Sequence, residues 1–191
     1  MKYTQKIKDA IVFAIKTHEL DQKQKRKGKD IPYITHPLTV GLILASAGAN
    51  EDLVSAGILH DTVEDSIETN KVTKEILAEK FGQNVADLVL SVTEQGISLT
   101  WEERKKEALE HIKNFSNDSV MLKSGDIISN VSEIKDDFDK DGNKMFDRFF
   151  ASKERTLEVY KNVAKELLIK WPESPLADDL QKILEKIELM K

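Results

Sequence analysis

The segment Ile58–Asp65 reads ILHDTVED and runs from an apolar stretch into four ionisable side chains. If helical turns continue through it, Glu64 lies one turn after His60. Asp65 then lies one turn after Asp61. Three carboxylates and an imidazole would meet there, and a divalent metal ion would neutralise them. An exposed acidic helix end explains the same residues about as well, so spacing alone leaves both interpretations open.

Helical periodicity extends from this segment in both directions along the chain. An apolar stripe at helical spacing near the N-terminus consists of Ile7, Ile11, Ala14 and Ile15. Further helices are expected at residues 38–47, 52–59, 72–80, 84–93, 101–115, 119–134, 147–171 and 176–190. Asn50 is a suitable N-cap for one of them, and Thr100 begins a capping box for another. No stretch alternates at period two, so we predict an all-α fold.

Three irregular segments are expected at residues 20–35, 64–71 and 135–146. The last is acidic and has aspartates at alternate positions followed by a glycine, namely Asp137, Asp139, Asp141 and Gly142. An EF-hand loop also needs a glutamate at its twelfth position, where this chain has Arg148. We interpret the segment as a solvated loop, with calcium binding as a distant alternative.

The composition indicates an ordinary globular protein with a single domain over residues 1–191. Hydrophobic residues make up 40% of the chain, and no apolar run is long enough to span a bilayer. The absence of cysteine excludes disulfides and thiolate metal ligands. A net charge of −5 argues against a protein that coats nucleic acid. The N-terminus lacks a signal-peptide cleavage site, so we expect a cytoplasmic protein without membrane or nucleic-acid partners.

A basic run interrupts the acidic average of the chain at Lys23, Lys25, Arg26, Lys27 and Lys29. Composition alone favours a solvated, lysine-rich loop. The more specific interpretation is a phosphate-binding edge of a pocket, and it needs support from other parts of the sequence.

Several polar residues outside the first segment are candidates for a role. His111 lies among charged residues and is expected at the surface, whereas His18 ends the first helix, where a cation is favourable. His36 lies just before a helix begins. Asp126 and Asn130 lie four residues apart on one face of an apolar helix. Buried carboxylates are usually paired or bound to a metal, so Asp126 is a candidate ligand.

Three sequence blocks, in this order, resemble the HD hydrolase domain of RelA/SpoT-type enzymes: YITHPL at 33–38, HDTVED at 60–65 and KSGDIISN at 123–130. Residues 81–89 and 103–105 are also similar to that family. The resemblance covers about residues 5–165 and implies a single HD-domain helical bundle of roughly eight to ten helices. Family members remove the 3′-pyrophosphate from the alarmones ppGpp and pppGpp. The chain has no room for their synthetase domain, so it resembles a stand-alone small alarmone hydrolase.

The third block departs from the family pattern. The family often has LADRLHN where residues 124–130 read SGDIISN. The lysine, the aspartate and the asparagine of the block remain, and the residues between them differ. The metal ligand is therefore in place, while the guanine specificity is open.

The resemblance implies one divalent ion, Mn²⁺ in the family, held by His36, His60, Asp61 and Asp126. Mixed imidazole and carboxylate ligands also suit iron or zinc, so the donors alone do not select manganese. Glu64 and Asp65 would orient and deprotonate the attacking water. The water would attack the phosphorus bonded to the ribose 3′ oxygen and release pyrophosphate, leaving GDP or GTP.

The resemblance also implies contacts to the substrate. Arg26 best matches a basic residue of the family, with Lys27 next, and a planar guanidinium suits both stacking and phosphate binding. Asn130 would bond the ribose or a phosphate. Arg104 and Lys105 would meet phosphates, although ion pairs with nearby glutamates explain them about as well.

Two alternatives to alarmone hydrolysis are open. The first is an HD phosphohydrolase that acts on another nucleotide or phosphorylated metabolite, because a fold does not determine a substrate. The second is a non-catalytic metal or nucleotide sensor, which has no need of the intact Glu64–Asp65 pair. The expected partner is a small nucleotide in each case, and the sequence does not decide between a monomer and a dimer.

Overall fold

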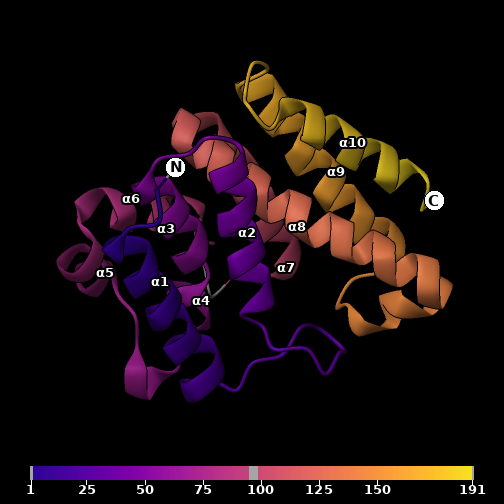
Figure 1. Ribbon diagram of the computed structural model, residues 1–191. Helices are drawn as coiled ribbons and strands as arrows, with labels where there is room; N and C mark the ends of the chain where they lie inside the picture. The colour runs from indigo at the N-terminus through magenta and orange to yellow at the C-terminus, as the bar shows by residue number, and fades with distance from the viewer. Residues whose placement is uncertain (1, 95–98, 191) are drawn as a thin grey trace. The chain divides into compact units, whose positions relative to one another are not determined.

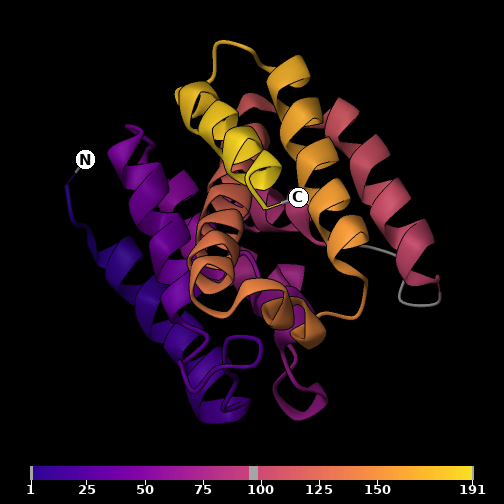
Figure 2. The same ribbon diagram turned by 90° about the vertical axis from the view of Figure 1, so that its right-hand side faces the viewer.

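The computed structural model describes residues 2–94 and 99–190, which form helices joined by turns and loops, as Figure 1 and Figure 2 show. They belong to two compact units, one within residues 1–94 and one within residues 95–191. The all-α prediction is confirmed, with ten α-helices among the described residues. None of these helices is both long and apolar enough to cross a membrane. The single domain over the whole chain stays a prediction.

The first unit is built around one buried helix. Its elements are α1 (Gln5–Ile15), a π-helical turn (Lys16–Asp21), α2 (Thr35–Ser46), α3 (Glu51–Leu59), α4 (Thr62–Asp65), a 3₁₀ turn (Glu68–Asn70), α5 (Lys74–Phe81) and α6 (Gln83–Val92). Helix α3 contacts α1, α2 and α6 (Figure 1). Every residue from Leu53 to Leu59 is buried. It begins where the sequence predicts, because Asn50 Oδ1 accepts a hydrogen bond from Leu53 N at 2.9 Å.

Two glycines let α2 and α3 approach each other closely. A Cβ atom on Gly57 would lie 2.5 Å from Leu44 Cδ1, and one on Gly41 would lie 2.6 Å from Ile58 Cγ1. Both distances are shorter than the separation of about 3.5–4.0 Å that carbon atoms in contact adopt. Because a short turn joins these two helices, they run antiparallel. The first turn of α2 therefore lies beside the end of α3, where the segment Ile58–Asp65 begins.

We expect Gly57→Val to lower the free energy of unfolding by about 2 kcal/mol, because the added carbons overpack the contact between α2 and α3. Leu44 is fully buried, which limits its freedom to move aside. Denaturant titration measures the effect. As a control, Leu42→Val changes a side chain of α2 that is 67% exposed. It should stay within about 0.5 kcal/mol of the original protein. Equal stability of both variants would show that the close approach is not needed.

The second unit contains α7 (Trp101–His111), a 3₁₀ turn (Ile112–Asn114), α8 (Asn117–Asp141), a 3₁₀ segment (Gly142–Arg148), α9 (Lys153–Lys170) and α10 (Ala177–Glu188). Helix α8 contacts both α9 and α10, and α7 contacts α9. The predicted capping box is confirmed at the start of α7. Thr100 Oγ1 accepts from Glu103 N, and the Glu103 carboxylate accepts from Thr100 N.

The loop predicted after residue 134 is wrong, because α8 continues to Asp141. Neighbouring cations neutralise the acidic side chains of this last part of the helix. Lys135 pairs with Asp139 at 2.5 Å. Arg148 pairs with Asp137 at 3.3 Å and with Asp141 at 2.5 Å. The aspartates that resembled a calcium loop therefore lie on a helix and take part in ion pairs.

Two helices begin more than two residues away from the predicted start. Helix α9 begins at Lys153, because Ser152 Oγ accepts the N–H of Arg155 and a 3₁₀ segment precedes it. Helix α2 begins earlier than predicted, at Thr35. His36 consequently lies inside the first turn of a helix, and its position is set by that helix.

Candidate metal centre

Two buried histidines face each other where α2 meets the end of α3. His36 is 3% exposed, and His60, which follows α3, is 5% exposed. Their ring centroids lie 5.2 Å apart, and one nitrogen of each ring lies within 4.8 Å of the other. His60 Nδ1 lies 2.8 Å from the carbonyl oxygen of Gly57, so Nδ1 carries a proton and Nε2 presents a lone pair. Metal-binding histidines are commonly oriented in this way by a backbone carbonyl.

Asp61 brings a carboxylate to the same point. Its Oδ2 lies 3.2 Å from His60 Nε2 and 3.6 Å from His36 Nε2. Two imidazole nitrogens and a carboxylate oxygen, with no thiolate, form a donor set that manganese, iron and zinc accept. A cation between them would offset the repulsion among their lone pairs. The residues present therefore fit a divalent metal ion.

Tyr33 supports the carboxylate of Asp61 with a hydrogen bond. Its hydroxyl donates to Asp61 Oδ2 at 2.7 Å. Burial, and then the negative charges of Asp61 and Asp65, raise the pKa of Tyr33, so the phenol keeps its proton and remains a donor. The Tyr33 ring lies 5.9 Å from that of His36, and the Arg26 guanidinium lies over it at 5.3 Å. Tyr33 thus connects the basic segment to the histidine cluster.

The two acids that follow the His-Asp pair have different partners. Asp65 N donates to Asp61 O at 2.9 Å, which confirms the predicted helical turn between them. Asp65 Oδ2 accepts from Gln24 Nε2 at 2.9 Å. Burial, and then the charge of Asp61, raise the pKa of Asp65. Glu64 is exposed, and its Oε1 accepts from Glu94 N at 2.5 Å. Asp65 therefore lies beside Asp61, whereas the carboxylate of Glu64 is hydrogen-bonded to the backbone that follows α6.

Sequence reasoning missed His18 and Gln24. It treated His18 as a cation at a helix end, and the structure adds that the ring is completely buried. His18 Nδ1 lies 2.8 Å from Gln24 Oε1, and the ring packs against Tyr33 with centroids 5.0 Å apart. One signal for this burial was present, because position 18 continues the apolar stripe at positions 7, 11 and 14. Gln24 carried no such signal.

Helix α8 of the second unit carries Asp126 and Asn130 on one face, as the sequence predicts. Asp126 is 7% exposed. Its Oδ1 accepts from Asn130 Nδ2 at 2.6 Å, and its Oδ2 accepts from Lys123 Nζ at 2.8 Å. The three residues that the third sequence block shares with the family thus form one network, which orients the carboxylate of Asp126.

The substrate contacts predicted for four basic residues stay predictions. Arg26 is half-buried, while Lys27 beside it is exposed. Arg104 and Lys105 lie on α7 of the second unit and are half-buried. Arg104 Nε is buried and has no hydrogen-bond partner among the described residues. It is therefore a donor that an anion could satisfy.

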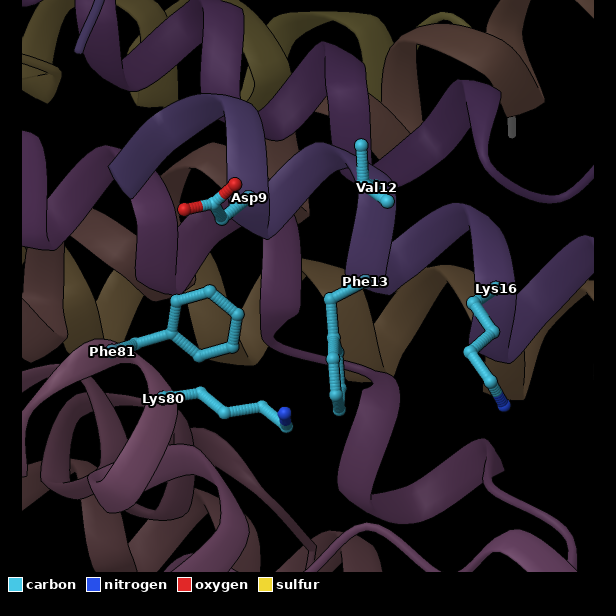
Figure 3. A pocket seen from close by; sticks show the side chains of 6 residues that line it. All are labelled: Asp9, Val12, Phe13, Lys16, Lys80 and Phe81. Carbon is cyan, nitrogen blue, oxygen red and sulfur yellow. The ribbon is translucent and has the colours of Figure 1, made fainter. Parts of the chain in front are cut away.

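A hollow of about 320 Å³ opens on the first unit. Figure 3 shows the side chains that line it, which are Asp9, Val12, Phe13, Lys16, Lys80 and Phe81. Phe13 and Phe81 meet edge to face, with centroids 5.5 Å apart. None of the candidate site residues lines this hollow, so it is separate from the histidine cluster.

Comparisons with known proteins identify the family of the chain. The family model of the HD domain matches residues 10–167. A guanosine-3′,5′-bis(diphosphate) 3′-pyrophosphohydrolase, MESH1 of Xenopus tropicalis, is 36% identical over 131 residues, which are 68% of this chain and 69% of that protein. An enzyme with the same activity in its name, from Aquifex aeolicus, is 35% identical over 135 residues. That match covers 70% of this chain but only 18% of the longer Aquifex protein.

A solved structure shares the fold. It is described as a metazoan orthologue of SpoT that hydrolyses ppGpp, and it matches with a TM-score of 0.78 over 97% of both chains. The sequences are 22% identical, so this likeness concerns the fold alone. It confirms the helical architecture that the three sequence blocks imply.

Proposed function

The chain belongs to the HD domain family and resembles its RelA/SpoT-type hydrolases, and we propose that it removes the 3′-pyrophosphate from ppGpp and pppGpp. The observation that carries the proposal is the cluster of the buried His36 and His60 with the half-buried Asp61, in which two imidazole nitrogens meet one carboxylate oxygen. The names of the related pyrophosphohydrolases support the choice of substrate.

The proposed metal ligands are His36, His60, Asp61 and Asp126. The first three meet within one unit, and Tyr33 supports the carboxylate among them. Asp126 is proposed because it is a buried carboxylate whose two oxygens are oriented on α8, and because it occupies the acidic position of the third block. We propose Mn²⁺ as the ion, following the family resemblance.

A bound divalent ion would lower the pKa of water and polarise the phosphorus–oxygen bond under attack. Asp65 would take a proton from the water, since a raised pKa brings a carboxylate closer to the range that suits a general base. A bond forms between the water oxygen and the phosphorus on the ribose 3′ oxygen. The bond to that 3′ oxygen breaks, the ribose hydroxyl regains a proton, and pyrophosphate leaves. Glu64 would assist in orienting the water.

The basic residues would hold the substrate. Arg26 would stack on or pair with the nucleotide, because its guanidinium already lies over the ring of Tyr33 beside the histidine cluster. Lys27, Arg104 and Lys105 would meet the phosphates, and Asn130 the ribose or a phosphate. The cytoplasmic location, the absence of nucleic-acid and membrane partners, and the oligomeric state stay predictions.

The first experiment measures pyrophosphate release from ppGpp by metal-stripped protein, with and without added Mn²⁺. We expect release with Mn²⁺ and none without it, and parallel arms with Mg²⁺ and Zn²⁺ test the identity of the ion. Turnover confined to other nucleotides would keep the metal centre but reject the alarmone substrate. Metal binding without turnover of any nucleotide in the panel would favour a sensor.

A further inference from the structure

We propose that Gln24 is a positioning residue for Asp65, and that His18 sets the orientation of the Gln24 amide. The three side chains form a chain of hydrogen bonds within the first unit. His18 Nδ1 lies 2.8 Å from Gln24 Oε1, and Gln24 Nε2 donates to Asp65 Oδ2 at 2.9 Å. The inference rests on the proposed function, in which Asp65 takes the proton of the attacking water.

The direction of donation along this chain follows from the chemistry of its groups. An ionised carboxylate only accepts hydrogen bonds, so Gln24 turns its amide nitrogen to Asp65 and its carbonyl oxygen to His18. His18 must then carry a proton on Nδ1. His18 Nε2 is buried and meets no hydrogen-bond partner among the described residues. The hydrogen bond from Nδ1 to Gln24 Oε1 therefore fixes the direction in which the amide faces.

Backbone hydrogen bonds on both sides of Gln24 fix the position from which its side chain starts. Gln24 N donates to His18 O at 2.8 Å, and Gln24 O accepts from Tyr33 N at 3.0 Å. The preceding residue, Lys23, has a φ of 52°, in the left-handed region that a lysine rarely adopts. His18 lies in the π-helical turn after α1, and single π-turns occur frequently at functional sites. Such unfavourable conformations persist where the surrounding structure holds them, often beside a functional side chain.

The consequence concerns the direction of the Asp65 carboxylate. Gln24 holds one of its oxygens, so the other oxygen faces a defined direction, as a general base requires. Without the amide, the carboxylate can rotate about its terminal torsion, which has a broad energy profile. The rate of proton transfer should then fall, while the affinity for substrate and metal stays the same. The expected signature is a loss of kcat with an unchanged KM.

The first test compares Gln24→Met with Gln5→Met. Methionine keeps the length of glutamine but removes the amide, so Gln24→Met should lower kcat for ppGpp by about 10- to 100-fold. KM and the bound Mn²⁺ should not change. Gln5 is a matched control, because its amide also donates to an aspartate, Asp9, at 2.7 Å, but on the exposed face of α1. Its variant should keep the original kcat.

The second test uses two substitutions of His18. His18→Asn keeps an N–H group near the position of Nδ1, whereas His18→Leu has no donor. We expect His18→Leu to lower kcat by about 10-fold or more, and His18→Asn to restore most of that loss. A purely structural role for the ring would not distinguish the donor from the apolar replacement. Equal kcat values for these two variants would therefore contradict the orienting role of His18.

A measurement on the original protein does not depend on how the variants fold. Nitrogen-15 spectra of labelled histidines in the metal-free protein report the tautomer of each ring, and the His18 signals are those lost in His18→Asn. We expect a proton on Nδ1, and an Nδ1 without a proton would overturn the proposal. Absence of ppGpp turnover by the original protein is a separate outcome that rejects the proposed function. With turnover intact, an unchanged kcat for Gln24→Met would overturn the inference alone.

Discussion

His60→Ala is expected to lose both the bound metal and the hydrolysis of ppGpp. His60 Nε2 lies 3.2 Å from Asp61 Oδ2, so the substitution removes one of the three donors that meet there. A metal ion supplies several kcal/mol of charge stabilisation in the transition state. A loss of about 4 kcal/mol corresponds to a rate about 1000-fold lower. Metal content by mass spectrometry and pyrophosphate release on the same samples measure the two losses.

The control for this variant is His111→Ala. His111 is exposed at the end of α7 and packs only against Phe115 among the aromatic rings described, at 5.5 Å between centroids. Its substitution should change neither metal content nor rate. Circular dichroism of both variants checks that they are folded, since His60 is buried. A folded His60→Ala protein with full metal content and full turnover would refute the assignment of His60 as a ligand.

The parts of the fold that the sequence predicted well are those that local chemistry determines. Asn50 caps α3 and Thr100 caps α7 through bonds to residues three positions on, which a sequence shows directly. The length of α8 was not predictable in this way. At its acidic end, Asp137 and Asp141 pair with Arg148, which follows in the next segment. Such a contact depends on how the chain turns back on itself.

In the candidate site, too, the residues of recognisable sequence blocks were predictable, whereas a contact that depends on the course of the chain was not. His36, His60 and Asp61 could be named from their sequence blocks, and the structure brings these three together. The contact between His18 and Gln24 could not be predicted, because it depends on a π-helical turn and on a lysine in the left-handed region. Neither conformation is what the residue types there favour.

Asp65→Asn is expected to lower kcat for ppGpp by about 100- to 10,000-fold, the usual contribution of a general base. Asparagine has nearly the same shape and can still accept the hydrogen bond from Gln24, but it cannot take a proton. Metal content and KM should therefore stay close to those of the original protein. Asp9→Asn is the control, because Asp9 is an exposed aspartate that also accepts from a glutamine, and its variant should be unchanged.

The comparison with Glu64→Gln decides which of the two acids takes the proton. Adjacent residues of a helix leave its axis about 100° apart, so the side chains of Asp65 and Glu64 start in different directions. Asp65 lies beside Asp61, whereas Glu64 accepts from the backbone of Glu94, a bond that a glutamine oxygen can keep. We therefore expect a smaller loss of kcat for Glu64→Gln than for Asp65→Asn in the same pyrophosphate assay. The reverse order would transfer the role of base to Glu64 and leave Asp65 as the residue that orients the water.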